Sequence, residues 1–215
     1  MDCTKLLLSV LSTFILLSCE QKEAPPKQQQ PGTITPVKSP RDDKERLYNV
    51  DKSPMDIVYF PEDFPVLKMS GKVEGAPVAR VIYSRPSKDG RAIFGNVVKY
   101  GTYWRLGANE GTEIEFFSDV VINGQRVRKG RYIIYCIPYD KKWTIKLNND
   151  LFSWGLRIHS NRDVYTFDIP VSKLNQPLEI FTMKFSETNE GGELIMAWDS
   201  VRAQLPFVPQ VVNRP

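Results

Sequence analysis

The sequence predicts an all-β protein: a single antiparallel β-sandwich of jelly-roll-like type, with about nine or ten strands. Two observations lead to this prediction. Beyond Ser53, apolar and polar residues alternate with a period of two in most segments, as in strands with one buried face. Small groups of Gly, Pro, Asp and Lys separate these segments and are typical of turns. With 41% hydrophobic residues in 215, the chain can build one sizeable core.

Each expected strand follows from its own pattern. In the first, Leu67, Met69 and Val73 alternate with charged and polar residues. The segment 131–137 is apolar on both faces, which is typical of a central strand. Asn123-Gly124 is the favoured dipeptide of a type I′ hairpin and follows a short strand directly. The alternating segments are 66–74, 78–85, 112–117, 120–122, 143–147, 164–169, 178–185 and 193–201.

One segment has a different period. Phe94, Val97 and Val98 are spaced as on one face of a helix, so the sequence predicts a single helical turn over 92–98. Gly95 within that turn weakens it.

The start of the chain predicts a secretory signal. A short polar segment with Lys5 precedes an apolar run over 6–17, which is too short to span a membrane as a helix. The run ends in L-L-S-C at Cys19, which resembles the lipobox of bacterial lipoproteins. The resemblance implies that 1–18 is removed and that Cys19 carries acyl chains, which anchor the protein to a membrane. A secreted protein cleaved near Ser18 without lipid is the alternative.

Composition sets the remaining boundaries. Pro, Gln and charged residues dominate up to Ser53, so we expect 19–53 to be the lipidated cysteine and a disordered linker, 54–206 the β-sandwich and 207–215 a loose tail. The expected location is the bacterial cell envelope, with the protein lipid-anchored to the outer membrane at its periplasmic face or at the cell surface. The segment 20–23 resembles the charged signal that directs some lipoproteins to the surface.

The residue inventory excludes several classes of protein. The net charge of +4 comes from scattered Lys and Arg residues, so no nucleic-acid partner is expected. With one histidine, and Cys136 as the only cysteine beyond the linker, the domain cannot build a His- or Cys-ligated metal site or an internal disulfide. Cys136 lies in an apolar run and is expected to be a buried hydrophobic residue. Phosphate-loop, dinucleotide-binding and nucleophile-elbow motifs are missing, so no cofactor is expected.

Two sets of side chains could still support acid–base catalysis. His159 could serve a triad, although a solvated or structural histidine fits its polar surroundings better. Glu113 and Glu115 share one strand face at roughly 6–7 Å, between the separations used by retaining and inverting glycosidases. Two glutamates on an outer strand face also arise from solvent exposure alone.

The stretch around Trp104 carries the candidate ligand site. Arginine forks suit carboxylate, phosphate or sulfate groups, an indole gives a stacking face, and amide and carboxylate groups bond sugar hydroxyls. Glycines at 107 and 111 would let the backbone approach a ligand. The candidate ligand-binding residues are Arg85, Arg91, Trp104, Arg105, Asn109 and Glu110.

The same residues have a structural interpretation. Asn109 can occupy a left-handed turn position, and Trp104 can cover the end of the core with its indole N–H bonded to a loop carbonyl. An arginine paired with Glu110 would then fasten the long crossover between residues 86 and 111 to the sandwich. The sequence alone leaves both interpretations open.

A set of motifs resembles a bacterial exported family, the domain of unknown function 2911. The likeness runs in order from about Ser53 to Pro206 and implies a β-sandwich-like exported domain, without an assigned activity. The motifs are Tyr83-Ser-Arg-Pro, Gly90-Arg, Ile93-Phe-Gly, Tyr100-Gly, Trp104-Arg, Gly107-Ala-Asn-Glu, Gly124, Gly130-x-Tyr, Ile137-Pro, Trp143-Thr, Asn148, Trp154-Gly and Trp198.

Three functions remain compatible with these observations. The first is a non-catalytic binding or interaction module at the cell envelope, with the membrane, an envelope glycan or a protein as partner. The second is a glycan-acting hydrolase that uses Glu and Arg residues of 85–115. The third is a purely structural lipoprotein. A carboxylate beside the arginines in a concave site would favour the hydrolase, and an aromatic wall without one would favour binding.

Overall fold

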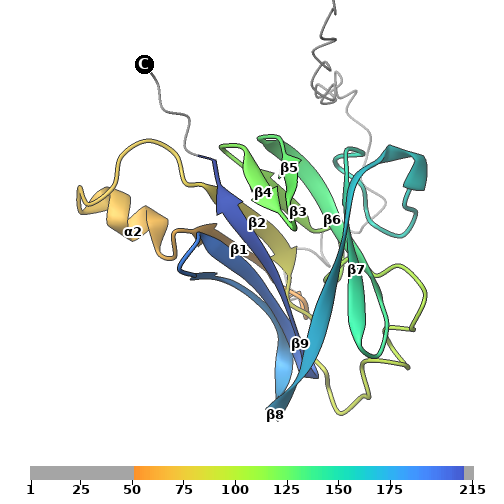
Figure 1. Ribbon diagram of the computed structural model, residues 1–215. Helices are drawn as coiled ribbons and strands as arrows, with labels where there is room; N and C mark the ends of the chain where they lie inside the picture. Colours follow the sequence, from red (N-terminus) through yellow and green to blue (C-terminus); the bar gives the residue numbers. More distant parts are fainter. Residues whose placement is uncertain (1–50, 211–215) are drawn as a thin grey trace, which may run out of the picture.

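The computed structural model describes residues 51–210, which form one nine-stranded antiparallel sheet (Figure 1). This confirms the all-β prediction. The predicted signal peptide, Cys19, most of the linker and the last five residues lie outside the described residues. The strands are β1 (Met55–Phe60), β2 (Ala79–Ser84), β3 (Glu113–Phe116), β4 (Val120–Ile122), β5 (Gln125–Val127), β6 (Gly130–Pro138), β7 (Lys142–Asn148), β8 (Asp163–Glu187) and β9 (Gly192–Pro209).

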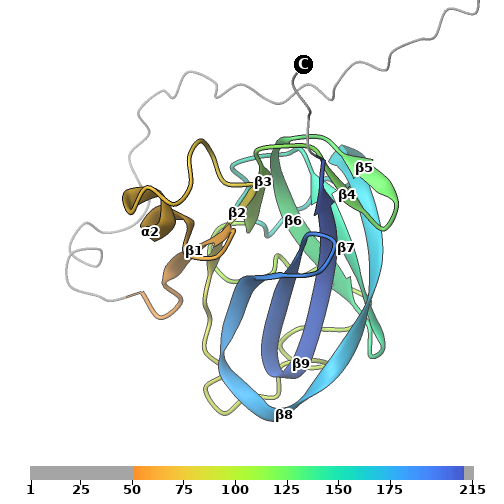
Figure 2. The same ribbon diagram turned by 60° about the vertical axis from the view of Figure 1, so that its left-hand side comes forward.

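The order of strands in the sheet is β1-β2-β3-β6-β7-β8-β9-β4-β5. The long strands β8 and β9 join its two halves. The first part of β8 pairs with β7, as in Lys142↔Pro170, and its last part pairs with β9, as in Phe185↔Leu194. The end of β9 then pairs with β4. The sheet is therefore continuous, and Figures 1 and 2 show the β8–β9 hairpin turning across the other strands.

A single hydrophobic core lies between the two halves of the sheet. Ile134 and Ile145 of β6 and β7 belong to the same buried cluster as Met183 and Met196 of β8 and β9. Cys136 is fully buried in this cluster, and burial raises the pKa of its thiol well above the ordinary value. The expectation that Cys136 is a buried hydrophobic residue is confirmed.

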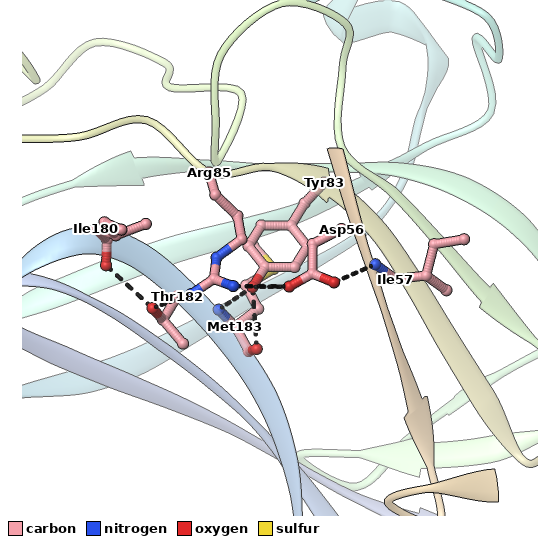
Figure 3. A network of polar contacts seen from close by, with 7 residues as sticks. All are labelled: Asp56, Ile57, Tyr83, Arg85, Ile180, Thr182 and Met183. Carbon is pink, nitrogen blue, oxygen red and sulfur yellow. Dashed lines mark hydrogen bonds and ion pairs between the residues drawn. The ribbon is translucent and has the colours of Figure 1, made fainter. Parts of the chain in front are cut away.

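The open edge of β8 is closed by a side chain rather than by a strand. At Met183, β8 pairs with β9 alone, and the Tyr83 hydroxyl of β2 reaches the backbone of Met183 (Figure 3). Arg85 adds a second contact across the same gap, because its guanidinium bonds Asp56 of β1 and the hydroxyl of Thr182. These contacts connect β1 and β2 to β8 without a strand ladder.

The crossover between β2 and β3 is fastened by backbone bonds at both ends. The amide of Trp104 donates to the Cys136 carbonyl at 2.7 Å, and the Cys136 amide donates back at 2.9 Å. Near its start, the Phe181 amide donates to the Pro86 carbonyl at 3.0 Å. The crossover, drawn in yellow-green in Figure 1, therefore joins β6 to β8.

Two of the expected elements are wrong. The segment predicted as a strand over 66–74 begins as helix α2 (Phe64–Met69), with Pro65 in its first turn. Its alternating residues do not face a core, because Phe64 is the one buried residue of the helix. The helical turn expected over 92–98 is a tight turn instead. Gly95 adopts φ 87°, which a right-handed helix does not allow.

The predicted boundary at the carboxyl end of the domain is also wrong. The tail expected from Phe207 begins as strand, because β9 continues to Pro209. Phe207 is 2% exposed and packs edge-on against Phe60 at 5.1 Å between ring centroids. The core therefore includes the residue at which the tail was expected to start. Within residues 51–210, no helix is long and apolar enough to cross a membrane.

Candidate functional site

A cavity of about 620 Å³ lies beside the crossover and brings together three of the six candidate residues, Arg91, Trp104 and Arg105. No Asp or Glu is found among the described residues that line it. The lining residues are Ser53, Pro86, Arg91, Val97, Val98, Thr102, Tyr103, Trp104, Arg105, Gly107, Ala108, Gly155, Leu156 and Trp198.

Trp104 forms an aromatic wall of this cavity. Its ring stacks on Trp198 at 5.9 Å and 22°, and it meets Trp143 edge-on at 5.7 Å and 90°. Phe94 and Phe181 contact the same ring. The backbone of Trp104 is paired with β6, and its ring is packed against these aromatic neighbours, so the position of the indole is fixed. One part of the side chain remains at the cavity surface.

Arg105 places a half-buried positive charge in the cavity wall. One guanidinium nitrogen, Nη1, donates to the Trp154 carbonyl at 3.1 Å. Arg105 makes no ion pair in the described part of the chain, and burial lowers its pKa. Removal of a charge from water is unfavourable unless a partner compensates it, and the partly buried Arg105 carries a share of this cost. This guanidinium is therefore able to bind an external anion.

Gly155 makes room for the Arg105 side chain. A Cβ atom at Gly155 would lie 2.8 Å from Arg105 Cδ and 3.0 Å from its Cβ, and the glycine has φ 77°. The same loop is tied to the crossover by Tyr103, whose hydroxyl donates to the Leu156 carbonyl at 2.7 Å. The Trp154-Gly155 motif thus shapes the site. Sequence reasoning missed it as a site element, and its adjacent Trp and Gly were the available signal.

Arg91 lies at the exposed rim of the cavity. Its Nε donates to the Lys88 carbonyl at 2.9 Å, and Nη2 donates to the Ser87 carbonyl at 2.7 Å. These bonds fix the plane of the guanidinium within the crossover. Arg91 therefore adds a second positive charge to the same opening as Arg105.

Arg85 and Asn109 do not line this cavity. Arg85 belongs to the network of Figure 3, in which it bonds Asp56 Oδ2 at 3.1 Å. Asn109 adopts φ 57°, the left-handed turn position expected of it. Its side-chain amide donates to Asp51 Oδ2 at 2.8 Å and to the Ser53 carbonyl at 3.3 Å. Both side chains hold the start of the domain in place.

Glu110 is separated from the arginine cavity as well. It is exposed and lines a smaller cavity of about 300 Å³ together with Glu113. The Arg–Glu110 pair of the structural interpretation is not formed, since Arg105 bonds a carbonyl group and Arg85 bonds Asp56.

Both sets of catalytic candidates have structural partners. Glu115 is paired with Arg80, and Glu113 lies 3.7 Å from Arg131, while burial raises the pKa of Glu113. His159 is exposed, and its Nδ1 lies 2.6 Å from Asp150 Oδ2. Among residues 51–210, no group of three or more His, Cys, Asp and Glu side chains could hold a metal ion.

Comparison with known proteins gives one match. The profile of the family described as "Protein of unknown function (DUF2911)" covers residues 65–207, from α2 through most of β9. No curated protein matches the chain, and no solved structure matches it. The matched region contains every lining residue of the cavity except Ser53, among them Trp104, Arg105 and Gly155. The chain belongs to the DUF2911 family, whose function is unknown.

Proposed function

We propose that this chain is a lipid-anchored protein of the bacterial envelope, and that its β domain binds an anionic ligand in the Arg105 cavity without transforming it. The observation that carries the proposal is the half-buried guanidinium of Arg105, which faces a cavity without a carboxylate partner. An anionic ligand would supply the missing negative charge.

The absence of an acid–base pair favours binding over hydrolysis. A glycan-acting hydrolase needs two carboxyl groups beside the bond that it breaks. No acidic side chain lines the described part of the cavity, and Glu110 and Glu113 lie together in another one. The glutamates of 85–115 are thus separated from the arginines with which the hydrolase alternative combined them.

The shape of the cavity indicates the class of ligand. Its volume of about 620 Å³ lies within the range that holds small molecules. The planar fork of Arg105 suits a carboxylate, phosphate or sulfate group, and Arg91 strengthens the positive potential at the rim. The Trp104 indole offers an apolar face to the rest of the ligand. An acidic sugar or cell-wall fragment has both parts.

The lipid anchor is proposed from the L-L-S-C sequence at Cys19. Acyl chains there would hold the protein on a membrane, and a coil over 19–53 would place the domain roughly 30–40 Å from the anchor. The membrane and the bound envelope component are the two partners of this proposal.

The test measures binding of defined anions to the full chain in detergent micelles. Inorganic phosphate, sulfate and N-acetylmuramic acid are titrated by calorimetry against the wild type, Arg105→Gln and Arg105→Lys. We expect at least one probe to bind the wild type, about tenfold weaker binding to Arg105→Lys, and loss of binding in Arg105→Gln. Arg157→Gln is the control, because it removes an exposed arginine from the neighbouring loop.

Equal binding to the wild type and Arg105→Gln would contradict the proposal. So would the combination of no binding by any probe with early melting of Arg105→Gln, which would show that Arg105 serves the structure alone.

A further inference from the structure

A second cavity, of about 700 Å³, shares no lining residue with the Arg105 cavity. It is bounded by the crossover, the turn between β6 and β7, and the middle of β8 and β9. We propose that this second cavity binds a sugar ring that carries an acidic group. The inference does not depend on the Arg105 site, because different side chains carry it.

Aromatic rings give the cavity its apolar surface. Tyr100 and Tyr139 are each 43% exposed, and neither ring packs against another aromatic ring of the described chain. Phe94 and the fully buried Trp143 lie at 5.4 Å from each other and line the same cavity. Two half-exposed aromatic rings suit the C–H face of a sugar, since aromatic side chains combine apolar area with little loss of rotamer entropy.

The two tyrosines are positioned by backbone bonds. The Gly101 amide, next to Tyr100, donates to the Pro138 carbonyl at 2.9 Å. The Tyr139 amide donates to the Lys142 carbonyl at 2.8 Å and closes the turn between β6 and β7. These bonds fix the backbone from which both rings project, so binding loses less conformational entropy than it would on a mobile loop.

Two lysines give the cavity a positive charge. Lys141 and Lys173 line it, and neither ammonium group makes an ion pair in the part of the chain that the structure describes. The neighbouring Lys142, in contrast, is paired with Asp168 at 2.6 Å. The charge of Asp199, another lining residue, is balanced by Lys88 at 2.9 Å. The other charged lining residues are one carboxylate, Asp140, and the two lysines, which leaves a net positive charge.

The polar rim matches sugar hydroxyl groups. Ser200 offers a hydroxyl that can donate and accept. The Ser172 hydroxyl donates to the Arg202 carbonyl at 3.5 Å and can accept, and the Asp140 carboxylate accepts hydrogen bonds. A simple inorganic anion would use the lysines but gain nothing from Tyr100 and Tyr139. A neutral sugar would use the rings but leave the lysines without a counter-charge. An acidic sugar uses both sets of groups.

The test titrates trigalacturonate, its fully methyl-esterified form and inorganic phosphate into the full chain in detergent micelles. We expect trigalacturonate to bind the wild type, and to bind about tenfold more weakly to Tyr139→Ala and to Lys173→Gln. The neutral ester should bind about tenfold more weakly than the acid. Lys72→Gln, which removes an exposed lysine far along the chain from the cavity, should bind as the wild type does.

The Arg105→Gln variant separates the two sites. If it keeps trigalacturonate binding while Lys173→Gln loses it, the second site is supported, whatever the result for the Arg105 cavity. If Arg105→Gln loses the binding and Lys173→Gln keeps it, the ligand occupies the first cavity and the second site is overturned. Absence of binding to the wild type would overturn it as well. Phosphate binding that is insensitive to Tyr139→Ala, with no preference for the sugar, would overturn the assigned class of ligand.

Discussion

The hydroxyl group of Tyr83 bonds both backbone polar groups of Met183: it accepts from the amide at 2.9 Å and donates to the carbonyl at 3.2 Å. One side chain of β2 thereby takes the place of a strand beside β8 (Figure 3). Burial raises the pKa of Tyr83 to about 12, so the hydroxyl keeps the proton that it donates at neutral pH.

Tyr83→Phe is expected to destabilise the domain. The change leaves a buried amide and a buried carbonyl without partners, which costs about 2 kcal/mol and lowers Tm by roughly 4–8 °C. Thermal unfolding followed by circular dichroism measures this. Tyr59→Phe is the matched control, because its hydroxyl has no hydrogen bond within residues 51–210. An equal Tm for the two variants would mean that the Met183 backbone finds other partners.

Gly155→Ala should weaken anion binding at the Arg105 cavity and lower stability. Gly155 and Gly124 both have φ 77°, but a Cβ atom at Gly124 would meet nothing within 4 Å. Gly124→Ala therefore measures the backbone strain alone, about 1 kcal/mol. Gly155→Ala adds the collision with Arg105, and we expect a larger loss of stability together with lost binding. Identical effects of the two variants would argue that Gly155 does not position Arg105.

Asp119→Asn should make stability less dependent on pH. Although burial opposes its ionisation, the Lys129 amide at 2.8 Å and Arg126 at 2.6 Å lower the pKa of Asp119. A depressed pKa contributes stability above the unfolded-state pKa, and this is lost as pH falls through the folded-state value. The variant should be about 1 kcal/mol less stable at pH 7 and equal to the wild type in strong acid. Urea unfolding across this range checks it; a constant difference would exclude ionic stabilisation.

Phe207→Ala is expected to destabilise the domain by about 3–5 kcal/mol, because Phe207 packs against Phe60, Phe116 and Phe185. Phe152→Ala removes the same side chain from a position that is 61% exposed, and should change stability by about 0.5 kcal/mol or less. Chemical denaturation measures both. A small change in stability for Phe207→Ala would indicate that this residue belongs to the loose tail expected from the sequence.

Cys19→Ala should abolish acylation and partitioning into the detergent phase when the chain is made in a bacterium that processes lipoproteins. Mass spectrometry and phase separation detect the two properties. Cys3→Ala is the control, because that cysteine lies within the predicted signal peptide. Unchanged partitioning of Cys19→Ala would leave the alternative of a secreted protein without lipid.

Local patterns predicted much of the sheet. The Asn123-Gly124 hairpin is confirmed, since both residues take positive φ values, 48° and 77°, between β4 and β5. The alternation around Leu67 misled, because period two alone does not reveal whether a core faces the segment. The continuity of β8 could not be read from sequence either. Its first part pairs with β7 and its second part with β9, and the register of the β8–β9 pairing shifts twice between Lys173 and Thr182, which depends on the whole sheet.

The candidate site shows the same limit. Trp104 and Arg105 are adjacent, so one segment predicts that they lie close together. Arg85 lies outside the cavity because it bonds Asp56 of β1, a strand that the sequence did not predict. Asn109 lies outside it because it bonds Asp51 in the expected linker. Trp198 lines the cavity from β9 and stacks on Trp104. These residues are far apart in the sequence, so no local pattern predicts their contact.

The contact between Phe60 and Phe207 has a consequence for the order of assembly. Phe60 ends the first strand and Phe207 lies near the end of the last. This contact therefore cannot form until nearly all of the domain has emerged from the ribosome. Contacts so far apart along the chain form slowly, because a long loop must close first. A nascent chain of this sequence therefore stays without a closed core until its synthesis is almost complete, and a channel that accepts only unfolded chains could still take it during that interval.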